Sequence, residues 1–228
     1  MSDHLFPHYT NPGSESYRQR VLPLRQRMEV YNGWLRKRLE TLLPRLMDEC
    51  GIEMWLVVAR EYNEDPVIMS LLPEPNLYAR RRTILVFHRK PDKVDRLAVY
   101  RYGFGDFYEG VWDPEKEDQY ECLARIIRER NPENIGINVS ETWAFGDGLT
   151  HSEYTQLVDA LGDLSQRLTS AETLCVRWLE TRIPEELETY PTLVELTHAI
   201  VQEAFSSKVI APGVTTTEDV QWWMRQRM

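Results

Sequence analysis

Hydrophobic residues recur along the chain with two different spacings. Five leucines at helical spacing come first and are followed by Gly51, namely Leu35, Leu39, Leu42, Leu43 and Leu46. Residues 52–59 then form a nearly continuous apolar run, which is typical of a strand buried on both faces. The pattern predicts a helix that is kinked at Pro44 and ends at Gly51, and then a central strand.

The alternation of helix and strand patterns continues to about residue 173. Further strands are predicted at residues 83–88, 96–102 and 135–139 and near Leu168, and helices at 119–130 and 152–161. This order predicts an α/β fold in which helices flank a mixed sheet. The preceding arm, residues 1–33, is expected to be irregular until about Val21 and then to form a short helix.

The pattern after residue 173 is helical and contains no strand. Pro184, Glu185 and Glu186 are typical of a first helical turn, because proline lacks the unpaired N–H and carboxylates complement the helix dipole. The helix is expected to kink or restart at Pro191. A turn at Pro212-Gly213 and a capping-box spacing from Thr215 to Glu218 predict one more helix. The chain is therefore divided into an arm (1–33), an α/β domain (34–173) and a helical segment (174–228).

Two stretches of this helical segment resemble landmarks of a known enzyme family. They are Arg-Trp-Leu-Glu-Thr-Arg-Ile-Pro-Glu-Glu-Leu at 177–187 and Pro-Gly-Val-Thr-Thr-Thr-Glu-Asp-Val at 212–220. Their pattern and order resemble the pita-bread metallopeptidases, which include Xaa-Pro aminopeptidases, prolidases and creatinase. The resemblance covers residues 34–228. It implies a creatinase/prolidase-like N-terminal domain, followed by the first helices of an incomplete α+β pita-bread domain.

The resemblance also implies a function for a longer parent protein. In the family, two aspartates, a histidine and two glutamates bind two divalent metal ions, and these ligands follow the second landmark. The implied parent is a Xaa-Pro peptidase and hydrolase that uses manganese, cobalt or zinc, acts on peptide substrates and forms a homodimer. The chain ends before those ligands, so we expect this fragment to hold no metal cofactor and to be inactive alone.

Two other hypotheses compete with this interpretation. The chain could be a stand-alone, non-catalytic binding or oligomerisation module of the same fold. It could also be an independent α/β hydrolase that uses an acidic loop, although no nucleophile motif supports this hypothesis. The nucleotide sequence after Met228 separates the first two, because an open frame encoding the metal ligands favours the peptidase.

Composition and charge limit the class of protein further. Hydrophobic residues make up 42% of the chain and charged residues 28%, as in a globular protein. The net charge of −9 argues against nucleic-acid binding, which depends on clustered basic residues. We find no signal peptide or apolar run long enough to cross a membrane, and therefore expect a cytoplasmic protein. The isolated cysteines Cys50, Cys122 and Cys175 are expected to be reduced thiols.

Two polar clusters are candidate substrate-binding sites, and no residue is assigned a catalytic role. One cluster follows the central strand, where open α/β sheets present ligand groups: Glu61, Asn63, Glu64 and Asp65. A solvated acidic loop explains it equally well. The other cluster, Arg80, Arg81 and Arg82, could bind a substrate carboxylate by bidentate hydrogen bonds or protect a strand edge from pairing.

A third cluster contains side chains of the kind that bind metals. Asp147, His151 and Glu153 span a turn and the start of the predicted helix at 152–161. Aspartate and serine are favoured as helix caps at such positions, and no second ligand pair lies close in sequence. We therefore favour helix capping and predict no metal ligand here. Gly103-Phe104-Gly105 is interpreted as a turn with exposed aromatic residues.

Overall fold

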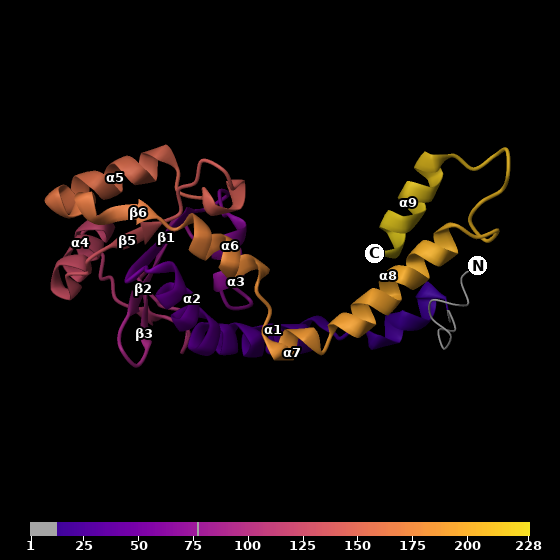
Figure 1. Ribbon diagram of the computed structural model, residues 1–228, viewed down its shortest axis with the longest axis horizontal. Helices are drawn as coiled ribbons and strands as arrows, with labels where there is room; N and C mark the ends of the chain where they lie inside the picture. The colour runs from indigo at the N-terminus through magenta and orange to yellow at the C-terminus, as the bar shows by residue number, and fades with distance from the viewer. Residues whose placement is uncertain (1–12, 77) are drawn as a thin grey trace. The chain divides into compact units, whose positions relative to one another are not determined.

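The computed structural model describes residues 13–76 and 78–228 (Figure 1). Its contacts divide the chain into two compact units. Met28–Ile183 forms an α/β unit, and Met1–Arg27 together with Pro184–Met228 forms a helical unit. Our division of the sequence at residues 33 and 173 stays a prediction.

The α/β unit is built on a mixed sheet. Within the described residues the sheet has six strands in the order β4-β3-β2-β1-β5-β6. The strands are β1 (Met54–Arg60), β2 (Arg82–Arg89), β3 (Val94–Ala98), β4 (Glu109–Gly110), β5 (Ile135–Ile137) and β6 (Leu168–Ser170). Strand β2 is antiparallel to β1 and to β3, and the other pairs are parallel. The predicted α/β class with a mixed sheet is confirmed.

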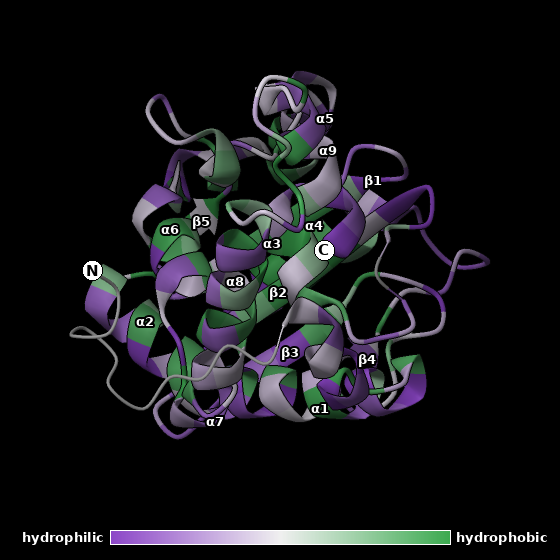
Figure 2. Ribbon diagram, turned by 90° about the vertical axis from the view of Figure 1, so that its right-hand side faces the viewer, coloured by the Kyte–Doolittle hydropathy of each residue, from purple (hydrophilic) through white to green (hydrophobic). Residues whose placement is uncertain are grey.

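Helices cover both faces of the sheet, so its central strand is buried twice. Trp55 and Val57 of β1 pack against α2 (Leu43–Cys50), α3 (Pro66–Leu71) and α6 (Glu172–Glu180). Met54 and Leu56 face the opposite layer, formed by α4 (Gln119–Arg130) and α5 (His151–Leu161). The hydrophobic colour of β2 in Figure 2 reflects the same burial of a neighbouring strand. Alternate side chains of β1 therefore belong to two separate cores.

The helix before β1 is longer than the sequence suggested. Helix α1 (Leu24–Lys37) continues through a π-helical turn (Arg38–Leu42) into α2. Pro44 has no N–H to donate to the Glu40 carbonyl, and the π turn accommodates that missing bond without breaking the helix. The helix predicted after about Val21 is present from Leu24, but it is not short, because it is continuous with the helix before β1. The predicted left-handed end at Gly51 is confirmed by its φ of 65°.

The helical unit contains a 3₁₀ helix, η1 (Ser14–Arg20), with α7 (Pro184–Leu187), α8 (Tyr190–Ala204) and α9 (Thr217–Arg227). Its ends are joined by polar contacts: Ser14 Oγ donates to Glu203 Oε2 at 2.6 Å, and Arg227 pairs with Glu15 at 2.7 Å. Residues 14–20 are thus regular, against our prediction, while residues 1–12 lie outside the described part of the chain.

Two start signals in the helical unit can be checked. The helix restarts near Pro191 as predicted, with α8 beginning at Tyr190. The capping box before α9 is formed by Thr216 and Asp219, one residue later than the predicted pair Thr215 and Glu218. Asp219 accepts the Thr216 N–H at 2.9 Å and holds the first turn in place.

A buried arginine connects the first and last helices of the α/β unit. The Arg38 guanidinium donates to the carbonyl oxygens of Trp178 and Thr181, the latter at 2.6 Å, and lies 4.5 Å from the centre of the Trp178 ring. These carbonyls end α6, where a positive charge also complements the helix dipole. Trp178 is fully buried and donates to Ser70 Oγ at 2.8 Å. One side chain therefore fixes where α6 stops.

We expect Arg38→Ala to lower the free energy of unfolding by about 2–4 kcal/mol, because it leaves one buried and one half-buried carbonyl oxygen without their charged donor. Urea unfolding followed by tryptophan fluorescence measures this change. Arg45→Ala is the control, since the exposed Arg45–Glu49 pair on α2 contributes about 0.5 kcal/mol or less. Equal losses in the two variants would contradict the role given to Arg38.

Candidate functional site

The polar ends of three strands meet at one edge of the sheet. Because β2 is antiparallel to β1 and β3, its first residue lies beside the last residues of its neighbours, and Arg82 is paired with Arg60. Arg80 and Arg81 precede β2. The segment from Tyr100 to Tyr102 follows β3 at the same edge. Residues from three parts of the sequence thus surround one region.

A wide cavity of about 740 Å³ opens at this edge, and we call it the arginine groove. It is lined by five arginines, two carboxylates, four aromatic or proline rings and two glutamines: Arg60, Arg80, Arg81, Arg82, Arg101, Asp118, Glu153, Tyr100, Tyr102, Trp112, Pro114, Gln119 and Gln156. The excess of arginines makes the groove locally positive in a chain whose net charge is −9. Such a surface attracts small anions.

A buried carboxylate organises the floor of the arginine groove. Glu153 is 2% exposed and lies 2.6 Å from Arg82 Nε and 3.6 Å from Arg60 Nε. The Tyr120 hydroxyl donates to Glu153 Oε2 at 2.7 Å. Burial, together with this bond to a carboxylate, raises the pKa of Tyr120 far above its ordinary value. Arg82 also lies over the Tyr120 ring, so its charge is already used within the protein.

Arg80 and Arg81 are placed differently. Both are exposed, and neither forms an ion pair with a carboxylate among residues 13–76 and 78–228. Their backbones are fixed: the Arg80 N–H donates to Thr83 Oγ1 at 3.4 Å, and the Arg81 carbonyl accepts from the Glu61 N–H at 3.0 Å. Arg81 has a left-handed φ of 53°. The two guanidinium groups are therefore available to an external anion.

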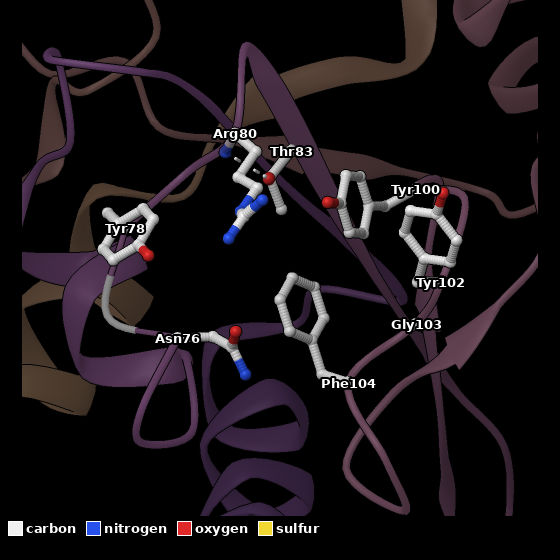
Figure 3. A pocket seen from close by; sticks show the side chains of 8 residues that line it. All are labelled: Asn76, Tyr78, Arg80, Thr83, Tyr100, Tyr102, Gly103 and Phe104. Carbon is white, nitrogen blue, oxygen red and sulfur yellow. Dashed lines mark hydrogen bonds between the residues drawn. The ribbon is translucent and has the colours of Figure 1, made fainter.

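A second, smaller cavity of about 260 Å³ adjoins the groove, and we call it the tyrosine cavity. The two cavities share Arg80, Tyr100 and Tyr102. Figure 3 shows the Arg80 side chain extending into the space between Tyr78 on one side and Tyr100 with Phe104 on the other. The rings of Tyr100 and Phe104 stack, with centroids 5.5 Å apart. The two cavities together offer flat rings beside positive charge.

The stacked rings of Tyr100 and Phe104 lie next to a tightly packed loop. Gly103 has a φ of +63°, and a Cβ at this position would lie 2.7 Å from the Gly110 nitrogen, so a side chain does not fit. The Phe104 N–H donates to the Tyr108 carbonyl at 3.0 Å. The Tyr108 hydroxyl donates to the buried Leu71 carbonyl at 2.6 Å. Phe104 is only 8% exposed, so our interpretation of 103–105 as a turn with exposed aromatics was wrong for that residue.

The structure separates the two predicted substrate-binding clusters. Arg80, Arg81 and Arg82 line the arginine groove, whereas no residue of the acidic loop lines either cavity. Glu61 and Asn63 are exposed. Glu64 Oε1 accepts the Ala79 N–H at 2.9 Å, and Asp65 accepts the Ile68 N–H at 2.7 Å as the cap of α3. A role in substrate binding stays a prediction for all seven residues.

Asp65 is the most confined member of the acidic loop. Burial raises the pKa of its carboxyl group, and the hydrogen bond from the Ile68 N–H opposes that rise. Gly148 approaches so closely that a Cβ there would lie 1.5 Å from Asp65 Oδ2. Asp65 thus caps a helix that we did not predict, although aspartate followed by Pro66 is a helix-start signal.

The predicted caps and the implied metal can be tested at the start of α5. The cap is Thr150, whose Oγ1 accepts the Glu153 N–H, and not Asp147 or Ser152. Asp147 accepts the Ser140 N–H at 3.1 Å, and Glu153 is held by arginines. Over the described residues, no three His, Cys, Asp or Glu side chains are grouped to hold a metal ion. Asp147 and Glu153 thus have other partners, and the metal ligands that the family resemblance implies would follow the second landmark.

Comparison with known proteins gives a similarity to a solved structure. No protein-family model matches the chain, and no curated protein matches it. Among solved structures, it is similar to a Xaa-Pro dipeptidase from Bacillus anthracis, with a TM-score of 0.47 and 16% sequence identity over 88% of this chain and 49% of that one. The chain therefore spans about half the length of that structure. Within the part of the chain that the structure covers, no helix is both long and apolar enough to cross a membrane.

We expect Asp65→Asn to stabilise the protein relative to wild type increasingly as the pH rises from 3 to 7. The raised pKa means that the folded state holds the Asp65 proton more tightly, so stability is lost as the pH rises from the ordinary value of 3.8 through the folded pKa. Asparagine keeps the cap and removes this loss. Urea unfolding at pH 3, 5 and 7 measures the difference.

Asp65→Ala is the matched control for the cap. It removes the acceptor for the Ile68 N–H and should cost about 1 kcal/mol, most clearly at pH 3, where the carboxyl group is protonated in both states. A difference between Asp65→Asn and wild type that does not vary with pH would show that burial of the charged carboxylate is not the dominant effect.

Proposed function

We propose that this chain is the amino-terminal part of a metal-dependent Xaa-Pro aminopeptidase or prolidase-like peptidase. The observation that carries the proposal is the position of its first sequence landmark. Residues 177–187 cover the end of α6, the extended residues after it and the whole of α7. The α/β unit and the helical unit are joined within this stretch, between Ile183 and Pro184. A landmark at the joint between two units is what the family pattern implies.

The second landmark supports the same proposal. Gly213 has a φ of +78°, which favours glycine in the turn, and the Thr216 cap then starts α9. In the proposed parent, the hydrolytic centre would be formed by the metal ligands that follow the second landmark in the family pattern. Arg80 and Arg81 would contact the peptide carboxylate, and Arg82, which is paired with Glu153, would support them from the floor of the groove. The parent would be a cytoplasmic homodimer.

A stand-alone binding or oligomerisation module remains the second candidate. Large hydrophobic side chains on the helical unit favour it, since Leu193 is 53% exposed, Phe205 68% and Trp222 52%. Exposed apolar surface of this kind is typical of an interface. An independent hydrolase based on the acidic loop has less support, because Glu64 and Asp65 already accept backbone N–H groups.

We expect the purified 228-residue chain to carry no stoichiometric manganese, cobalt or zinc. Such ions need several grouped imidazole or carboxylate ligands, and Glu153 is instead neutralised by arginines. Elemental analysis after dialysis measures the metal content. One bound ion per chain would contradict the proposal and would direct attention back to Asp147, His151 and Glu153.

We expect the chain to hydrolyse no Xaa-Pro dipeptide or tripeptide, even with added manganese, cobalt or zinc. A protein extended at the carboxyl end through the family's ligands should gain metal-dependent activity, since a bound metal is needed to activate water near neutral pH. Proline release measures both. In the extended protein, Arg81→Gln should raise KM about tenfold if Arg81 binds the peptide carboxylate, whereas Arg45→Gln should not.

Two outcomes would contradict the peptidase proposal. Turnover by the 228-residue chain that a chelator abolishes would place a metal centre within it. Inactivity of a folded, metal-loaded extended protein would favour the binding module. An unchanged KM in Arg81→Gln with full activity would reject only the role of the arginine and leave the peptidase proposal intact.

A further inference from the structure

We propose that the arginine groove and the tyrosine cavity together bind a small organic phosphate that carries a planar ring, a ligand of the nucleoside monophosphate class. This ligand is distinct from the peptide discussed above. The inference does not depend on peptidase activity, because it rests on groups that lie within the α/β unit.

The charge of the groove favours phosphate over a single carboxylate. Glu153 lies beside Arg82 and Arg60, while Arg80 and Arg81 have no carboxylate partner among the described residues. Arg101 has a distant partner in Glu115, at 3.9 Å. A phosphate monoester carries up to two charges and three acceptor oxygens, so it can engage more than one guanidinium at once. One carboxylate would leave much of this charge unmatched.

The aromatic side of the site favours a ligand with a flat ring. Arg80 lies between Tyr78 and the stacked pair of Tyr100 and Phe104 (Figure 3). Tyr102 is 75% exposed, and the Arg101 guanidinium lies 5.6 Å from the centre of its ring. Exposed rings next to arginines are typical stacking surfaces for bases and other planar groups. The two cavities share Arg80 and Tyr102. One ligand can therefore place its ring in the tyrosine cavity and its phosphate in the arginine groove.

The size of the ligand is limited by the negative net charge of the chain and by the volume of the tyrosine cavity. The net charge of −9 repels a long polyanion, whereas a small anion in the groove is affected mainly by the arginines within a Debye length of about 8–10 Å. The tyrosine cavity, at about 260 Å³, is small enough for one ring system and too small for several. A mononucleotide satisfies both limits, and single-stranded nucleic acid does not.

Calorimetric titration of the full chain with adenosine 5′-monophosphate at low salt tests the proposal. We expect it to bind at least about tenfold more tightly than adenosine, ribose 5-phosphate, inorganic phosphate or benzoate, because each of these lacks the phosphate or the planar ring. Affinity should fall as salt is raised. Failure to detect binding at millimolar nucleotide would overturn the proposal, as would equal affinity for benzoate.

Variants divide the site into its two parts. Arg80→Gln and Arg81→Gln should each weaken nucleotide binding about tenfold, and Arg45→Gln, on the surface of α2, should not. Tyr102→Ala should weaken nucleotide binding about tenfold and leave inorganic phosphate binding unchanged, while Tyr102→Phe should bind normally. Tyr154→Ala is the matched control, because Tyr154 is 41% exposed and lines neither cavity.

The changed side chains are exposed, so each variant should unfold at the wild-type temperature, and thermal unfolding checks this. If Arg45→Gln and Arg80→Gln weaken nucleotide binding equally, the loss comes from the change in net charge, and the proposed site is refuted. Normal nucleotide binding by Tyr102→Ala would refute the stacking part. A peptidase-active extended protein that binds no nucleotide would reject this inference alone.

Discussion

The burial of β1 on both faces determines where polar chemistry can occur in the α/β unit. Every residue from Met54 to Ala59 is buried, and alternate side chains enter two separate cores. A charged group within such a strand would be desolvated without a partner, so charges gather where the strand ends. The antiparallel β2 brings Arg82 to the same end, opposite Arg60. Two arginines side by side then require a carboxylate, and Glu153 supplies it.

Glu153 connects the interior of the unit with its surface. Its carboxylate is buried and reaches Arg82, Arg60 and the Tyr120 hydroxyl, so three elements are held by one side chain. By pairing with Arg82 it also prevents that arginine from reaching outward. The exposed arginines Arg80 and Arg81 then lie beside this buried ion pair. A buried, partly neutralised floor with exposed charges at its rim suits reversible binding of small anions.

Local sequence patterns predicted most of the helices and strands, whereas the candidate site depends on how distant strands pair. Helix α4 has the predicted bounds, Gln119–Arg130, because its apolar stripe is visible within one stretch of sequence. The α/β class followed in the same way. Helix α3 was missed because Asp65 and Pro66 were considered as part of an acidic loop and not as a helix start. The capping box of α9 was placed one residue early among three consecutive threonines.

The candidate site was harder to predict because its members come together through the register of β2 and β3. Arg80 precedes one strand and Tyr100 follows the other, and nothing local in the sequence relates them. The sequence identified Arg80, Arg81 and Arg82 as a cluster, but it could not show that Arg82 is paired internally. It also grouped Glu61 to Asp65 as one candidate, whereas Asp65 is confined beside Gly148 and the others are not.

The chemical uniformity of the arginine groove has a consequence for how it would respond to the cell. Among the described residues that line it, every cation is an arginine, and there is no lysine or histidine. Guanidinium groups keep their charge at all physiological pH values, and they are not targets of lysine acetylation. The positive charge that the arginines supply would therefore stay constant through changes of acidity, and salt would be what changes its effect, by screening it.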